Sequence, residues 1–446
     1  MGIPSYFGYI IKKHRHIIKT YVDQRAHNLY MDCNSIVYDC VHEMESPTTA
    51  AIIEAVCARI LAYIELVNPA FAMVAFDGVP PMAKMKQQRE RRYKSECTGW
   101  NTVQITPGTT FMKHLDERVR QFFSRTKYHV LVSGSDVAGE GEHKIFEQIR
   151  SRSHKGESTF IYGLDSDLIM LALNHLDRCE SSLLREAAKF TVEGCPREGL
   201  CLLDVRMLAT EIGNIIGPTK LRDYILVTML LGNDFMPRFP ALNLRTDGMD
   251  YILHKYASVI LPEEHIVSEG INWSVLFKFV RALSLDETRR FRNEHNRPRK
   301  APPTEENLPM FRREMEMYIN PNEAGWEHRY YKTLCQSEPT PLFLKMICQH
   351  YYRMLNWTVH YYTSGCIDWA AYYPYMYPPL LVHLNQHHFD MLTYTLGAPA
   401  SPTELLAFVM PAKYAGFAEQ PYVPTPHAPK LYWAYCKYTW EAHLLF

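Results

Sequence analysis

Acidic side chains recur directly after the predicted strands of this 446-residue chain. The first two end predicted strands, two closely spaced pairs follow later strands, and the last follows a predicted helix. Ligands of an open parallel sheet bind beyond the carboxyl ends of its strands, so these carboxylates are expected to share one crevice. The candidates for chemistry are Asp32, Asp77, Glu140, Glu142, Asp165, Asp167 and Asp234.

Carboxylates gathered in this way need compensation, because neighbouring carboxylates raise each other's pKa. Mg²⁺ commonly binds through a few carboxylates plus water and substrate phosphate. Two such ions can activate water and stabilise the leaving oxygen in phosphodiester hydrolysis. A single Asp after a strand is more often a helix cap or turn residue than a ligand. The two doublets, each spaced by one residue, favour a shared metal site.

A basic segment follows Asp77. Within it Lys84, Gln88, Arg91 and Arg92 have the i, i+4, i+7, i+8 spacing of one helix face. Guanidinium groups bind phosphate through paired, charge-assisted hydrogen bonds. A solvated basic face is the alternative, but the nearby predicted metal ligand favours binding of a terminal phosphate.

These residues are positioned by strands that alternate with helices from about residue 29 to 239. This order predicts an α/β fold with a doubly wound, mainly parallel sheet. The predicted strands cover residues 28–32, 72–77, 127–133 and 159–164, and the predicted helices cover 143–150, the apolar segment after Asp167, and 221–231.

The chain divides into a predicted catalytic unit at 1–245, a helical or linker region at 246–340 and a final unit at 341–446 that packs on the core. Residues 285–327 are charged and contain prolines, which predicts a linker or exposed segment. Prolines exclude a regular helix over 372–379. The aromatic-rich tail from 430 to 446 is predicted to form a docked strand pair.

Composition excludes several classes of protein. Lys plus Arg and Asp plus Glu number 48 each, so a nucleic-acid site must come from local clustering rather than a general basic coat. The 11 cysteines form no CxxC pair, which argues against a zinc ribbon or a secreted disulfide framework. No apolar run reaches membrane-spanning length. We expect a soluble, cytoplasmic protein without a membrane partner, with the nucleus as the alternative.

Successive motifs of the chain resemble those of the XRN 5′→3′ exoribonucleases, in order. They are Met1–Phe7, Tyr30–Asn34, Phe76–Pro80, Lys84–Arg92, Ile105–Thr109, Gly139–Lys144, Tyr162–Leu168, Leu183–Glu186 and Gly232–Phe235. Trp357, Trp369 and Tyr372–Tyr375 resemble the second conserved region of that family. The resemblance is dense to about residue 245 and patchier from 340 onwards.

The resemblance implies a PIN-like, flap-nuclease-like α/β fold with two Mg²⁺ ions, for which Mn²⁺ is a substitute. All seven acids would hold metal, and Lys84, Gln88, Arg91 and Arg92 would form a 5′-phosphate pocket too narrow for a cap or triphosphate. The implied activity is two-metal-ion hydrolysis of single-stranded 5′-monophosphate RNA, releasing nucleoside 5′-monophosphates.

Three features depart from the family pattern. Tyr38 stands where the family has a base-stacking His. The stretch between Tyr93 and Ile105 is shorter than the insertion typical there, which puts in doubt what that insertion does with duplexes and processivity. The family's long C-terminal extensions are not present, which suggests a compact member such as a viral one.

Trp357 and Trp369 are further candidates to stack on bases, although both lie among aromatic residues and core packing is an equal alternative. A flap-type DNA nuclease shares the acidic architecture and is the alternative enzyme. A catalytically inactive RNA-binding scaffold is the alternative without enzymatic activity.

Overall fold

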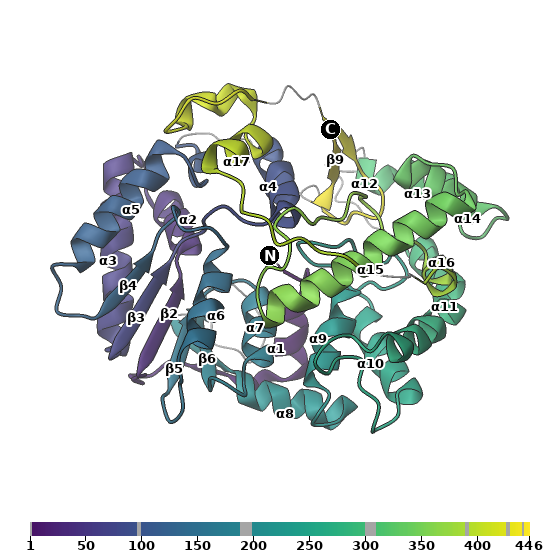
Figure 1. Ribbon diagram of the computed structural model, residues 1–446, viewed down its shortest axis with the longest axis horizontal. Helices are drawn as coiled ribbons and strands as arrows, with labels where there is room; N and C mark the ends of the chain where they lie inside the picture. Colours follow the sequence, from purple (N-terminus) through teal and green to yellow (C-terminus); the bar gives the residue numbers. More distant parts are fainter. Residues whose placement is uncertain are drawn as a thin grey trace.

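The computed structural model describes residues 2–95, 100–187, 199–298, 309–388, 392–424, 429–438 and 441–446. A seven-stranded sheet with helices on both faces forms one half, and helices form most of the other (Figure 1). The strands are β1 (Ile18–Thr20), β2 (Asn28–Asp32), β3 (Phe71–Ala75), β4 (Val130–Ser133), β5 (Thr159–Tyr162), β6 (Ser181–Glu186) and β7 (Leu200–Asp204), with β8 (Lys430–Tyr432) and β9 (His443–Leu445) forming a separate pair.

The sheet has the order β1-β7-β6-β5-β2-β3-β4. Strands β4, β3, β2, β5 and β6 pair in parallel, whereas β7 is antiparallel to both β6 and β1. The prediction of a mainly parallel sheet is confirmed, and the four predicted strands correspond to β2–β5 with ends shifted by up to three residues.

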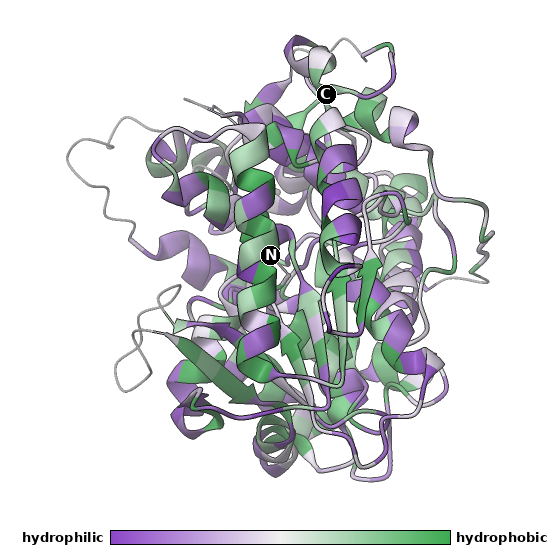
Figure 2. Ribbon diagram, turned by 90° about the vertical axis from the view of Figure 1, so that its left-hand side faces the viewer, coloured by the Kyte–Doolittle hydropathy of each residue, from purple (hydrophilic) through white to green (hydrophobic). Residues whose placement is uncertain are grey.

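Both faces of the sheet are buried, as the alternation of side chains along β2 shows. Leu29 and Met31 belong to one apolar cluster, whereas Tyr30 between them belongs to the other. The first cluster includes α2 (Asn34–Glu43), α3 (Thr49–Val67) and α5 (Thr110–Phe123). The second includes α1 (Tyr6–Lys13), α6 (Gly141–Ser151), α7 (Asp167–Asn174), α8 (Val205–Ile216) and α9 (Leu221–Met229). The strands are accordingly mostly apolar, and the helices around them have mixed faces (Figure 2).

The second cluster continues into the helical half, so the two halves share one core. The helices there are α10 (Gly248–Val259), α11 (Trp273–Asn296), α12 (Pro309–Arg312), α13 (Glu314–Ile319), α14 (Trp326–Tyr330), α15 (Pro341–Thr363) and α16 (Leu381–Gln386). Helix α15 begins with Pro341 after the N-cap Thr340, whose side chain accepts from Phe343 N. It runs from the helical half back to the sheet half (Figure 1).

The prediction of a linker or exposed segment over 285–327 is wrong for its first part, and also from residue 309, where α12–α14 bury Met310, Ile319 and Trp326. Residues 285–296 complete α11, and Glu287, Arg290 and Phe291 on it are buried. The Glu287 carboxylate accepts from Leu381 N and Val382 N at 2.7 and 2.8 Å. Charged side chains with specific partners replace apolar anchors here, so hydrophobic periodicity missed the helix. Residues 299–308 lie outside the described part of the chain.

Helix α4 (Met82–Lys94) packs against α17 (Pro402–Val409), which opens with a Ser401–Glu404 capping box. The short turns are η1 (Arg15–Ile17), η2 (Thr102–Gln104), η4 (Tyr331–Cys335) and η5 (Ala412–Phe417). Residues 372–379 are irregular, and β8 and β9 form an antiparallel pair, both as predicted.

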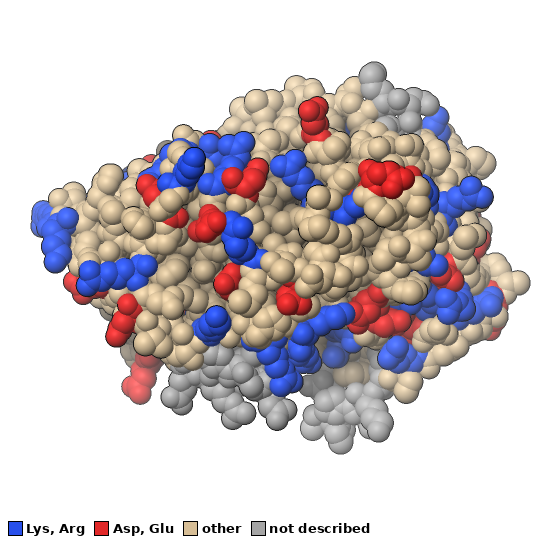
Figure 3. Space-filling view, turned by 90° about the horizontal axis from the view of Figure 1, so that it is seen from below, with Lys and Arg blue, Asp and Glu red and all other residues tan. Residues whose placement is uncertain are grey.

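Within the described ranges, no helix combines the length and apolarity needed to cross a bilayer. Lys and Arg are interspersed with Asp and Glu over the face seen in Figure 3. That face therefore has no extended patch of side chains of one charge, in keeping with the equal numbers of acidic and basic residues.

Candidate active site

The acidic residues gather where the strand order reverses. The chain passes from β2 to β3 and β4 on one side, and β5 then pairs with the other side of β2. Asp32 is the last residue of β2, and Asp165 lies just beyond the end of β5. A crevice at such a topological switch point is the usual ligand site of an open α/β sheet. The strand topology thus explains why residues far apart in sequence meet here.

One group of candidate metal ligands consists of three carboxylates. One ligand oxygen each from Asp32, Asp77 and Glu142 lies within 4.8 Å of the other two. The Asp77 carboxylate is fixed by Gly141 N at 2.8 Å and by Asn34 Nδ2 at 2.7 Å. Donors from two other elements thus hold Asp77 in place.

Asp32 supplies a buried carboxylate oxygen that is a candidate metal ligand. Its Oδ1 is buried without a hydrogen-bond partner among the described residues, and a Cβ at Gly141 would lie 2.6 Å from it. Burial, followed by the charges of Asp77 and Asp165, raises the pKa of Asp32 well above its ordinary value. Burial and the nearby Glu140 do the same to the pKa of Glu142. Buried, crowded oxygen ligands fit a hard divalent cation, which would supply the missing charge.

A second group consists of Glu140, Glu142 and His143, whose ligand atoms also lie within 4.8 Å of one another. His143 Nδ1 is buried without a partner. Burial, followed by the charge of Lys84, holds the pKa of His143 well below its ordinary value. The imidazole is therefore neutral at physiological pH, and the sequence analysis did not single it out.

Lys84 lies inside the acidic cluster rather than on an open basic face. Its Nζ is 2.5 Å from Glu140 Oε2 and 2.6 Å from Asp234 Oδ2. Burial opposes the ammonium charge, but Asp234 and Glu140 outweigh it and raise the pKa of Lys84 well above its ordinary value. Gln87 Nε2 donates to the other oxygen of Asp234 at 2.8 Å. Helix α4 therefore holds two of the acids directly.

The other members of the predicted phosphate pocket lie farther along α4. Gln88 is buried with Oε1 unpartnered, and Arg91 is exposed. Arg92 is buried and donates to Thr106 Oγ1 at 2.8 Å and to the Ile105 carbonyl at 2.9 Å. The predicted pocket thus combines one guanidinium that is anchored by two hydrogen bonds with one that is exposed.

Asp165 and Asp167 flank the start of α7. Asp165 is partly exposed in the loop after β5, and Asp167 is the buried first residue of the helix. Burial, followed by the charge of Asp234, raises the pKa of Asp167 to about 7. Asp167 Oδ1 accepts a hydrogen bond of 2.6 Å from the hydroxyl of Tyr362.

The predicted stacking residues occupy different environments. Tyr38 is half-buried on α2, with its hydroxyl beside the guanidinium groups of Arg91 and Arg92. Trp369 is half-buried, and its carbonyl accepts from Met82 N at the start of α4. Trp357 is fully buried and donates from Nε1 to the Asp368 carbonyl at 2.8 Å. The position of Trp357 favours core packing, whereas Tyr38 and Trp369 lie beside α4.

A cavity of about 400 Å³ leads to Asp234 from the side of the C-terminal strands. Its walls come from the N-terminal segment, from the loop after α9 and from the segment before β9. Representative lining residues are Pro4, Ser5, Met236, Arg238, Arg245, Tyr435 and His443.

Besides His143, the sequence analysis missed described residues whose side chains donate hydrogen bonds to the acids, namely Asn34, Gln87, Tyr361 and Tyr362. Asn34 and Gln87 lie beside residues that were singled out, so proximity in the chain was an available signal. Tyr361 and Tyr362 lie on α15 among many other aromatic residues, and nothing in their local sequence separates them from core.

Two family models match the chain. One, described as the XRN 5′-3′ exonuclease N-terminus, matches residues 1–99 and 95–187. The other, described as the Xrn1 helical domain, matches residues 219–323 and 319–424.

Curated relatives span most of the chain. It is 26% identical to 5′-3′ exoribonuclease 1 of Homo sapiens over 92% of this chain and 30% of the relative. It is 31% identical to 5′-3′ exoribonuclease 1 of Saccharomyces cerevisiae over 60% of this chain and 21% of the relative. It is 23% identical to 5′-3′ exoribonuclease 2 of Gallus gallus over 94% of this chain and 64% of the relative. The chain thus spans less than two thirds of each of these relatives.

Solved structures to which the chain is similar include the catalytic core of Rad2 in complex with DNA substrate. That comparison has a TM-score of 0.42 at 11% identity and covers 86% of this chain and 92% of the other. Another is the bacteriophage T5 D15 flap endonuclease, with a TM-score of 0.33 at 13% identity over 60% and 87% of the two chains.

Proposed function

The chain belongs to the XRN 5′-3′ exonuclease family, and we propose that it is a metal-dependent 5′→3′ exoribonuclease. Its proposed substrate is single-stranded RNA with a 5′-monophosphate, and its product is a nucleoside 5′-monophosphate. The observation that carries the proposal is the trio of Asp32, Asp77 and Glu142, with ligand oxygens within 4.8 Å of one another. A buried cluster of this kind needs a cation, and a phosphodiester hydrolase uses one.

Two Mg²⁺ ions are proposed, with Mn²⁺ as a substitute. Asp32, Asp77 and Glu142 would hold one, and the remaining acids Glu140, Asp165, Asp167 and Asp234 would serve the other. When bound, such ions activate water and stabilise the leaving oxygen. Lys84 already neutralises part of the charge of Glu140 and Asp234.

The chain's own residues bind and orient the RNA end. Gln88, Arg91 and Arg92 would bind the terminal phosphate, with Lys84 between that phosphate and the acids. Because Arg92 is anchored to Thr106 and Ile105, the pocket cannot widen on that side without breaking two hydrogen bonds. This anchoring supports selection of a monophosphate over a cap or triphosphate.

The proposed test is a time course on RNA labelled at the 3′ end or within the chain, bearing a 5′-monophosphate, a 5′-triphosphate or a 5′-hydroxyl. The proposal expects successive mononucleotide release from the 5′-monophosphate substrate with Mg²⁺ and none with EDTA. A matched DNA strand separates it from a flap-type DNA nuclease. Preference for DNA, release from the 3′ end or internal cleavage would contradict it. Binding without hydrolysis would instead indicate an RNA-binding scaffold.

A further inference from the structure

Helix α15 brings two adjacent tyrosines to two different acids. The Tyr361 hydroxyl donates to Glu140 Oε1 at 3.0 Å, and the Tyr362 hydroxyl donates to Asp167 Oδ1 at 2.6 Å. Each tyrosine is only 2% exposed. The tyrosines belong to the part of the chain that matches the helical-domain model, whereas the acids belong to the part that matches the exonuclease N-terminus. The acidic site is therefore built by both halves of the chain.

Packing fixes the ring of Tyr361. It stacks on His143 with ring centroids 3.6 Å apart and planes inclined by 25°, and on Trp357 at 4.7 Å and 22°. His143 follows Glu142 on α6, so the stack joins α15 to the element that carries two of the acids. The ring cannot turn without displacing its neighbours, and the direction of its hydroxyl is set.

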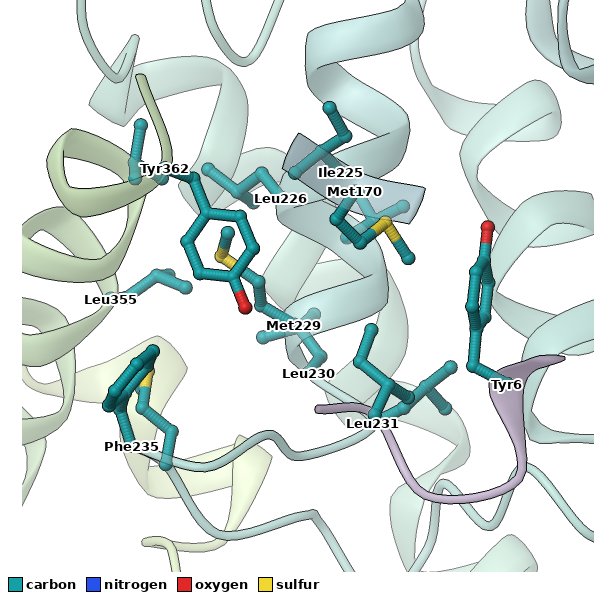
Figure 4. Close-up of a cluster of buried hydrophobic side chains, with 14 of the residues drawn as sticks. Tyr6, Met170, Ile225, Leu226, Met229, Leu230, Leu231, Phe235, Leu355 and Tyr362 are labelled. Atoms are coloured by element: carbon teal, nitrogen blue, oxygen red, sulfur yellow. The ribbon is translucent and has the colours of Figure 1, made fainter. Parts of the chain in front are cut away.

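Tyr362 is held by a separate set of contacts. Its carbonyl accepts from Asn174 Nδ2 on α7 at 2.8 Å, and Phe235 approaches the ring edge-on at 6.5 Å. In Figure 4 the ring of Tyr362 extends from α15 into an apolar cluster that also contains Met229 and Phe235. Asn174 and Asp167 are the two ends of α7, so both ends of that helix bond to Tyr362.

These hydrogen bonds fix the orientation of the carboxylates of Glu140 and Asp167. Glu140 has one oxygen bound by Tyr361 and the other bound by Lys84. Asp167 has one oxygen bound by Tyr362. A hydrogen bond donated to one oxygen of a carboxylate restricts its rotation and leaves the other oxygen to face a different partner. Partners of this kind around metal ligands orient the ligands and support metal affinity.

We infer that Tyr361 and Tyr362 are positioning residues, which hold the carboxylates of Glu140 and Asp167 in the orientation that a divalent cation needs. The inference rests on the proposed function only in taking that cation to be the cofactor of a nuclease. It assigns the helical half a direct part in building the metal site, beyond covering the sheet.

The test compares Tyr361→Phe, Tyr362→Phe and the double variant with Tyr352→Phe. Tyr352 is a matched control, because it is fully buried on the same helix and its hydroxyl bonds to the Leu384 carbonyl, away from the acids. Mn²⁺ and Mg²⁺ binding to the full chain is measured by calorimetry. The double variant should bind either ion about 10- to 100-fold more weakly, with the control close to wild type. Unchanged affinity in the double variant, or equal weakening in the control, would overturn the inference.

A second measurement separates positioning from general packing. In hydrolysis assays the tyrosine variants should need a higher Mg²⁺ concentration for half-maximal rate and should recover when Mg²⁺ is raised. Adding Tyr361→Phe to a Glu140→Gln variant should weaken metal binding little further, because the partner it acts on has already lost its charge. A full additive loss would show that Tyr361 does not act through Glu140.

The two hypotheses fail in different ways. If metal binding depends on the tyrosines but the wild-type chain does not degrade RNA, only the proposed function is contradicted. Metal-dependent RNA degradation with unchanged affinity in the tyrosine variants would contradict the positioning inference alone.

Discussion

The ammonium of Lys84 lies 2.6 Å from the carboxylate of Asp234, which joins the basic helix to an acid 150 residues later in the chain. A second carboxylate, that of Glu140, lies 2.5 Å from the same nitrogen. Lys84 is therefore the internal countercharge of the cluster as well as a candidate phosphate ligand. It joins the proposed pocket for the RNA end to the acids that would hold metal.

Replacing Lys84 by Met should destabilise the metal-free protein, because Glu140 and Asp234 would lose their buried countercharge. Removal of one partner of a buried ion pair typically costs about 3–5 kcal/mol of unfolding free energy. Urea unfolding in EDTA measures the loss, and saturating Mg²⁺ should restore part of it. An unchanged unfolding free energy in EDTA would show that the ion pairs do not stabilise the fold.

Arg91→Ala should slow degradation of 5′-monophosphate RNA roughly 10- to 100-fold, the range expected for one charge-assisted bond to phosphate. Degradation of 5′-hydroxyl RNA should hardly change. Arg118→Ala is the control, since Arg118 is paired with Glu54 on the surface of α5. Arg91 is exposed, so its removal should leave the melting temperature unchanged. Equal loss on both RNAs would assign Arg91 to the fold.

Tyr38→Phe and Tyr38→His should retain most activity, whereas Tyr38→Ala should lose roughly 10- to 100-fold in processive degradation, because an aromatic ring stacks on bases without needing its hydroxyl. A large fall in the melting temperature of Tyr38→Ala, or full activity in it, would exclude the stacking role.

Glu287 should make stability depend on pH. Burial raises its pKa to about 7 from an ordinary 4.5. Between these values the native state keeps a proton that the unfolded state releases, so its contribution to stability falls as pH rises. Urea unfolding of wild type relative to Glu287→Gln should show a loss on the order of 3 kcal/mol from about pH 4.5 to 7. A constant difference across this range would contradict the assignment.

The acids were predictable because of topology. Asp32, Asp77 and Asp165 follow parallel strands, and parallel strands end at one edge of a sheet. Helical spacing also predicted that Lys84, Gln88, Arg91 and Arg92 belong to one helix, and all four lie on α4. The orientation of the Lys84 side chain could not be predicted from the sequence. Its ion pairs with Glu140 and Asp234 join segments that only the tertiary fold brings together.

Long-range packing explains the remaining differences. Trp357 and Trp369 looked equivalent in the sequence, but the first is enclosed by the helical half and the second lies at the start of α4. The part of α11 beyond residue 284 was missed because Glu287 is buried there and caps α16 through two hydrogen bonds. Tyr361 and Tyr362 contact the acids because α15 crosses to the sheet half in the tertiary fold, which their local sequence does not indicate.

Asp165 and Asp167 provide the most direct test of the account, because both carboxylates belong to the acidic cluster. The measurement is the rate of mononucleotide release from 5′-monophosphate RNA by wild type and by Asp165→Asn/Asp167→Asn, with folding checked by circular dichroism. The account predicts Mg²⁺-dependent release by wild type and none by the folded double variant, because the carboxylates that would hold metal are lost. Near-native turnover in that variant, or wild-type turnover in EDTA, would contradict it.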